Sequence, residues 1–172
     1  MRQIVLILPI LLLLISCAST KFSGTAACTG RVCGPHGEPV EQYQVSFGVG
    51  LTTVSGINGM FLIPDVRAGT YTVRGGGKGW SSVEKEIEFT DRRGIVCIQV
   101  EPMTAVYQKV EGLLRQNFCD EAEKMLAKES VCNDSSPLFQ FYREVISYRK
   151  SPTEQKLKKI KDKVMEETAY EL

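Results

Sequence analysis

The spacing of the apolar residues changes once along this chain, near Pro102, and this change limits the folds that the chain can adopt. From Ala27 to Glu101, short β-prone runs are separated by glycine, proline, asparagine and aspartate, and apolar residues alternate within the runs. After Pro102 the apolar residues recur every three or four positions, the period of an α-helix. The sequence therefore predicts an α+β fold in two segregated parts, a β-rich part over 27–102 and a helical part over 103–172.

The β-rich part contains seven candidate strands, near 28–33, 43–49, 51–55, 60–64, 70–75, 83–89 and 95–100. Because no helical segment between them supplies a parallel crossover, we expect an antiparallel β-sandwich. Asn58-Gly59 predicts a tight turn, since this pair tolerates positive φ. Alternation predicts inward-facing side chains at Val45, Phe47, Phe61, Ile63, Tyr71, Val73, Ile87, Phe89, Val96, Ile98 and Val100.

The helical part is predicted to form a bundle of about four helices. The first two place apolar residues on one face and are separated only by a break at residues 117–119, which predicts an antiparallel hairpin. The third is expected to begin at Pro137, because Ser136 is a favourable N-cap and proline is favourable at the first helical position. The fourth is expected after Ser151-Pro152. Apolar residues of the hairpin include Val106, Val110, Leu113, Leu114, Ala122, Met125 and Leu126.

Two family resemblances follow from these motifs. The stretches "TGRVCGPHGEPVEQYQVSF" and "TTVSGINGMFLIPDVRAGTYTVRGGGKGW" resemble a carboxypeptidase regulatory-like domain of transthyretin-like, or prealbumin-like, fold. The features that carry this resemblance are Gly30-x-Val32, Gly37-x-Pro39-Val40, Thr53 ahead of Gly59-x-Phe61, Gly69-x-Tyr71 and Gly79-Trp80. The resemblance implies a fold and no particular activity, because such domains are attached to many unrelated proteins.

The helical hairpin resembles one tetratricopeptide-type repeat through Leu113, Ala122 and Leu126. Val110 and Glu129 stand where that family has small residues, and Asp134 stands where proline is usual. The alternative is an unrelated four-helix appendage.

The amino-terminal segment predicts export. Residues 4–15 are apolar apart from Pro9, and twelve residues suit the hydrophobic region of a signal peptide better than a membrane-spanning helix of about 20. The sequence Leu14-Ile15-Ser16-Cys17 resembles a bacterial lipobox, which implies that a signal peptide over 1–16 is removed and that Cys17 is acylated. Residues 17–26 are then a flexible tether. Ala18 replaces the aspartate of some inner-membrane lipoproteins, which favours the outer membrane over the inner membrane.

Beyond Cys17 the chain has five further cysteines, and five cannot all pair within one chain. Alternation predicts that Cys28 is a buried free thiol and that Cys33 and Cys97 point outward. In the resembled fold the first and last strands can lie close together, so Cys33–Cys97 is the candidate disulfide. The spacing of cysteines with the single histidine, His36, is unlike a zinc site, and no metal or cofactor is expected.

The sequence favours a binding function over catalysis. His36 lies in a polar turn and no nucleophile, base and orienting group can be assembled around it. Nucleic-acid binding is unsupported, because removal of 1–16 lowers the formal net charge from +1 to zero. We expect a lipid-anchored envelope protein, not an enzyme, that binds or scaffolds protein partners through its helical region.

The alternative function is a carbohydrate-binding lipoprotein that uses the loops of the sandwich. Its candidate residues are Trp80, Lys78 and Tyr43, with Trp80 as a stacking platform for a sugar. Trp80 has a competing interpretation as an aromatic plug at the sandwich edge.

Overall fold

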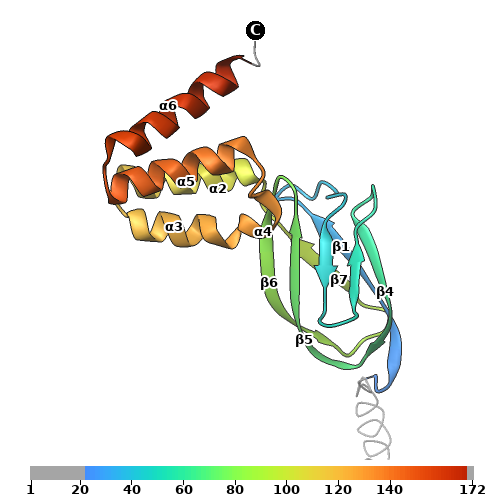
Figure 1. Cartoon of the computed structure of the whole chain (residues 1–172). Coiled ribbons are helices and arrows are strands. Elements are labelled where there is room, and N and C mark those ends of the chain that lie inside the picture. Colours follow the sequence, from blue (N-terminus) through green and yellow to red (C-terminus); the bar gives the residue numbers. More distant parts are fainter. Residues whose placement is uncertain (1–21, 170–172) are drawn as a thin grey trace, which may run out of the picture.

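The structure is a computed structural model that describes residues 22–169, so the predicted signal peptide and Cys17 lie outside the described residues. A β-sandwich is followed by a group of helices that projects from one end of it (Figure 1). The strands are β1 (Thr25–Cys33), β2 (Gln44–Ser46), β3 (Thr52–Val54), β4 (Met60–Arg67), β5 (Gly69–Gly77), β6 (Trp80–Phe89) and β7 (Ile95–Gln99). Strand β1 begins two residues inside the segment predicted as a tether.

The strands form two sheets, in the orders β4-β1-β7 and β3-β2-β5-β6. All neighbouring strands are antiparallel except β1 and β7, which run parallel with Thr29 opposite Ile95 and Cys33 opposite Gln99. The prediction of a wholly antiparallel sandwich is therefore wrong for this pair. A parallel pair needs a long connection but not a helix, and here strands β2 to β6 make that connection.

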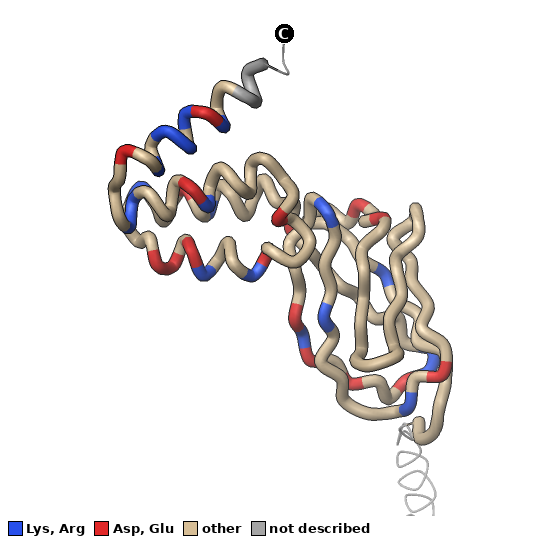
Figure 2. Tube along the Cα trace, in the orientation of Figure 1, with Lys and Arg blue, Asp and Glu red and all other residues tan. Residues whose placement is uncertain are grey.

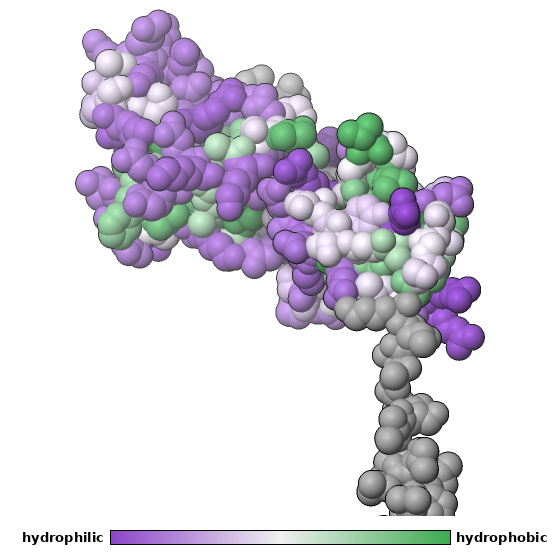
Figure 3. All heavy atoms as spheres, turned by 90° about the horizontal axis from the view of Figure 1, so that it is seen from below, coloured by the Kyte–Doolittle hydropathy of each residue, from purple (hydrophilic) through white to green (hydrophobic). Residues whose placement is uncertain are grey.

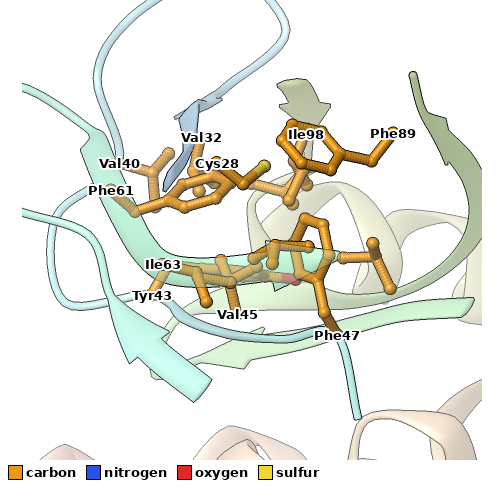
Figure 4. Packing of buried hydrophobic residues seen from close by; sticks show 13 residues of the cluster. Cys28, Val32, Val40, Tyr43, Val45, Phe47, Phe61, Ile63, Phe89 and Ile98 are labelled. Carbon is orange, nitrogen blue, oxygen red and sulfur yellow. The ribbon is translucent and has the colours of Figure 1, made fainter. Parts of the chain in front are cut away.

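Alternation identified the sandwich core correctly. Val45 and Phe47 from one sheet face Phe61 and Cys28 from the other in Figure 4, and all four are buried. The predicted positions Tyr71, Ile87 and Val96 are partly buried and pack against the same core. The remaining predicted inward positions, Ile63, Val73, Phe89, Ile98 and Val100, are also buried.

The predicted turn at Asn58-Gly59 is present. Gly59 has φ +74°, and the Asn58 side-chain oxygen accepts a hydrogen bond of 3.0 Å from the Met60 N–H. A side chain on Gly59 would also collide with the Val32 carbonyl oxygen, so both the backbone angle and the space require glycine.

Between residues 103 and 169 the structure has five helices rather than about four. They are α2 (Met103–Arg115), α3 (Cys119–Lys128), α4 (Ser130–Asn133), α5 (Pro137–Lys150) and α6 (Glu154–Ala169). The additional helix is α4, a single turn between the second and third predicted helices. The start of α5 at Pro137 after Ser136 is as predicted.

Helices α2 and α3 form the predicted hairpin, and α5 packs on both to close a second core. This core includes Val106, Val110, Leu114, Ala122, Leu126, Phe139 and Ile146. Lysine, arginine, aspartate and glutamate are interspersed along the helices in Figure 2. Among residues 22–169, no helix combines the length and hydrophobicity needed to cross a bilayer.

Candidate functional site at the junction of the two parts

Three consecutive glycines form the surface on which the two parts of the molecule meet. A Cβ atom on Gly75 or Gly77 would lie 2.5 or 2.8 Å from the ring of Tyr43, which fills the sandwich beneath them. A Cβ atom on Gly76 would lie 2.5 Å from the Cys132 Sγ atom on α4, on the opposite face of the strand. The glycine run at the end of β5 therefore lets a buried ring approach from inside and a helix from outside.

Asn133, at the end of α4, holds the β5–β6 turn through its side-chain amide. Its Oδ1 atom accepts a hydrogen bond of 2.9 Å from the Gly79 N–H, and its Nδ2 atom donates one of 3.2 Å to the Trp80 carbonyl. The Met103 N–H, at the start of α2, donates to the Gly79 carbonyl at 2.9 Å. Two separate points of the helical part thus fix the same turn, and Asn133 is itself buried.

Glu129, between α3 and α4, places a carboxylate in the same interface. Its side chain is 7% exposed, and its Oε2 atom accepts a hydrogen bond of 2.5 Å from the Ser82 N–H on β6. Burial raises the pKa of the Glu129 carboxyl, while the hydrogen bonds from Ser82 partly offset this rise. The Ser82 hydroxyl also donates to the Lys128 carbonyl at 3.2 Å, so the strand and the helix end are joined twice.

Two further titratable groups of the junction, Tyr43 and Cys132, also have raised pKa values. Tyr43 donates its hydroxyl to the Ser81 carbonyl at 2.8 Å; burial raises the pKa of this hydroxyl well above its ordinary range, and the negative charge of Glu129 adds to the rise. Burial also raises the pKa of the Cys132 thiol.

A groove of about 760 Å³ opens between the outer face of the β3-β2-β5-β6 sheet and α4. Its floor carries the amide of Gln44, the hydroxyls of Ser46 and Thr52, and an ion pair of 2.8 Å between Arg74 and Glu84. Its wall is the segment 128–132, in which Val131 is 91% exposed and Glu129 is buried. The groove therefore draws its lining from both parts of the molecule.

A smaller groove of about 220 Å³ lies between α3 and α5. Leu126, Phe139 and Ile146 supply its apolar lining, and Glu123 and Arg143 contribute charged groups. It belongs to the helical part alone.

The structure does not bring the predicted sugar-binding residues together on a surface. Tyr43 is fully buried, so its ring cannot stack on a ligand, and proposing it as a binding residue was wrong. Trp80 is half-buried and packs against the sandwich core, which agrees with the plug interpretation. Lys78 is exposed in the β5–β6 turn.

The predicted Cys33–Cys97 disulfide is absent, and both residues are free thiols. Cys33 lies opposite Gln99 and Cys97 lies opposite Arg31, so the register displaces the two cysteines by two positions instead of placing them opposite each other. A disulfide needs Cα atoms within about 7 Å. Cys28 is a buried free thiol, as predicted.

His36 is exposed in its turn. Within residues 22–169, no group of three or more His, Cys, Asp or Glu side chains is arranged to hold a metal ion.

Sequence reasoning missed Glu129, Asn133 and Ser82 as junction residues. The Glu129 side chain turns towards β6, where it accepts the Ser82 N–H. No local sequence pattern marks this contact between distant residues.

No family model matches the chain, and no curated protein is similar to it. Two solved structures with a similar chain are mutants of a type II cohesin–X-dockerin complex from Acetivibrio cellulolyticus. The N-terminal interface mutant gives 20% identity over 45% of this chain and 58% of the matched chain, with a TM-score of 0.39. The C-terminal interface mutant gives 22% identity over 44% and 56%, with a TM-score of 0.32. Both matches span less than two thirds of the other chain.

Proposed function

We propose that this chain is a lipid-anchored protein of the bacterial envelope that acts as a non-catalytic binding module for protein partners. The junction groove is the binding site. One observation carries this proposal: the sandwich and the helical part line a single groove, and Asn133 and Glu129 hold the two parts in the relative position that forms it.

The lining of the groove suits a polypeptide. Gln44, Ser46 and Thr52 offer amide and hydroxyl groups that can hydrogen-bond to a peptide backbone, and Val131 offers an exposed apolar contact at the wall. Strand β3 is an edge strand of its sheet, so an extended segment of a partner can pair with it as an added strand.

The hydrogen bonds of the site favour a binding role. The Tyr43 hydroxyl donates to the Ser81 carbonyl and the Glu129 carboxylate accepts the Ser82 N–H, so both groups are engaged within the junction. The envelope location rests on the resemblance of Leu14-Ile15-Ser16-Cys17 to a lipobox, and the outer membrane on Ala18.

The test is photo-crosslinking in growing cells with the full chain. A photoreactive residue at Val131, in the groove wall, is compared with one at Phe118, which is 48% exposed in the turn between α2 and α3. We expect a discrete protein adduct from position 131 and no such adduct from position 118. Equal adduct patterns from both positions would contradict the proposed site.

A blocking pair then tests whether the adduct depends on the groove. Thr52→Trp fills the groove floor, whereas Thr72→Trp adds the same side chain to the exposed outer face of β5 beyond the groove lining. We expect the Val131 adduct to be lost with Thr52→Trp and kept with Thr72→Trp. Retention of the adduct in both variants would place the partner elsewhere.

A further inference from the structure

The chain enters the sandwich at the end remote from the helices, and Phe22 is fixed there. The Phe22 N–H donates to the Thr90 carbonyl at 3.0 Å, and its ring packs edge-on against Phe89 with centroids 5.9 Å apart. The guanidinium group of Arg92 lies 5.3 Å from the centre of the same ring. Phe22, which lies within the predicted tether, is therefore held against the sandwich.

The distance from this end to a lipid on Cys17 is short. Phe22 is five positions after Cys17, and a fully extended chain spans at most about 3.6 Å per residue, or roughly 18 Å over five positions. A lipid on Cys17 would hold this end of the sandwich within that distance of the headgroups. The β5–β6 turn lies at the opposite end of the sandwich, and the helices project from that end (Figure 1).

Three loops lie towards the same end of the sandwich as Phe22. The β2–β3 loop lies beside the start of β5, because Phe47 contacts Tyr71 with ring centroids 5.7 Å apart. The β4–β5 turn and the β6–β7 loop meet at the same level, because Gly69 pairs with Phe89. We use the name entry end for residues 47–51, for residues 65–69 at the end of β4 and in the β4–β5 turn, and for residues 90–94.

The entry end carries one protruding apolar side chain and several cations. Val49 is fully exposed between Gly48 and Gly50 at the tip of the β2–β3 loop. Figure 3, which views the molecule from below, shows apolar atoms protruding beside hydrophilic ones on this face. The exposed charged residues at the entry end are Arg67, Arg92 and Arg93 with Asp65 and Asp91. The Asp91 Oδ1 atom accepts a hydrogen bond of 2.9 Å from the backbone N–H of Arg93.

We propose that the entry end is a membrane-docking surface, with Val49 entering the headgroup region and Arg67, Arg92 and Arg93 contacting anionic phospholipids. This inference rests on the proposed lipid anchor at Cys17. A lipid on Cys17 would hold the chain at the membrane but leave the folded part free to rotate, whereas a second contact made by the folded part sets an orientation. Docking in this orientation presents the junction groove away from the bilayer.

The experiment compares two tryptophan variants of the full lipidated chain, Val49→Trp at the entry end and Ile57→Trp at the opposite end. Ile57 is 80% exposed in the β3–β4 turn, and Trp80 remains in both variants as a common background. The proteins are reconstituted into vesicles of phosphatidylcholine and phosphatidylglycerol that contain brominated lipid. We expect bromine quenching of Val49→Trp at least twofold greater than that of Ile57→Trp. Exchanging Arg92 and Arg93 for glutamate should reduce this difference.

A second attachment separates failure of docking from failure of the anchor. Residues 1–17 are replaced by a hexahistidine tag, and the same two variants are bound to nickel-chelating lipid in the same vesicles. If quenching at position 49 still exceeded that at position 57 in this format, while no lipid was found on Cys17 in cells, the docking proposal would be supported and the lipid-anchor proposal would be contradicted. Equal quenching at positions 49 and 57 would overturn the docking proposal.

Discussion

Gly75→Ala tests the packing beneath the junction most sharply. The added Cβ atom would lie 2.5 Å from the Tyr43 Cε1 atom and 2.8 Å from the Gln44 carbonyl oxygen, where ordinary contacts begin at 3.4 Å. Neither neighbour can move freely, because Tyr43 is fully buried with its hydroxyl bonded to Ser81, and Gln44 is paired with Gly76 in the sheet. Overpacking of this kind costs about 1–3 kcal/mol.

For a chain of this size, 1 kcal/mol shifts the midpoint of thermal unfolding by about 2–4 °C, so we expect Gly75→Ala to lower the midpoint by about 2–12 °C. Gly69→Ala is the matched control on the same strand, because a Cβ atom there meets nothing within 4 Å. Its midpoint should equal or slightly exceed that of the wild type. The assay is circular dichroism of the full chain on heating. Equal midpoints for the two variants would refute the close approach of Tyr43 to Gly75.

Three further predictions concern the buried carboxylate, the lipid site and the tight turn. Because burial raises the pKa of Glu129, its contribution to stability is fully present below about pH 4.5 and is lost as the pH rises through the raised pKa. Glu129→Gln keeps an acceptor for the Ser82 N–H but has no charge to gain, so it should not lose stability as the pH rises. At pH 7 its midpoint of thermal unfolding should equal or exceed that of the wild type. If the wild type became more stable relative to the variant between pH 5 and 7, this prediction would be contradicted. Cys17→Ala should abolish metabolic lipid labelling and leave an uncleaved or soluble precursor, and unchanged detergent partitioning would count against acylation. Gly59→Val should destabilise the sandwich by about 1 kcal/mol or more, because φ is positive and Val32 leaves no space; an unchanged urea midpoint would argue against the turn.

The elements of the fold were predictable because their signals are local. Alternation located the strands and the core, and the serine-proline pair located the start of α5. Alternation also places Tyr43 on the inward face with Val45 and Phe47. The sugar-binding hypothesis failed for Tyr43 because it took an aromatic residue as a ligand platform and ignored this parity.

The pairing of distant strands was not predictable from local patterns. Alternation determines which face a residue occupies, but not its partner, so Cys33 and Cys97 were placed outward correctly and paired wrongly. The parallel register of β1 and β7 separates them by two positions. Helix α4 was missed for a related reason, since four residues are too few to display a helical period.

The junction depends on contacts between residues about 50 positions apart, which no motif in the sequence marks. Asn133 bonds to Gly79 and Trp80, and Glu129 bonds to Ser82. The glycine run was visible as a sequence feature. Its role in the junction depends on Tyr43 and Cys132, which approach its two faces from distant parts of the sequence.

The central claim, that a protein partner binds in the junction groove, is tested most directly by hydrogen–deuterium exchange of the full chain with and without the partner captured at Val131. The account predicts slower exchange on binding at Gly76, at Ser82 and across 128–132, with no change in β4 or α6. Slower exchange confined to β4, α6 or the entry end, with the groove unaffected, would contradict it.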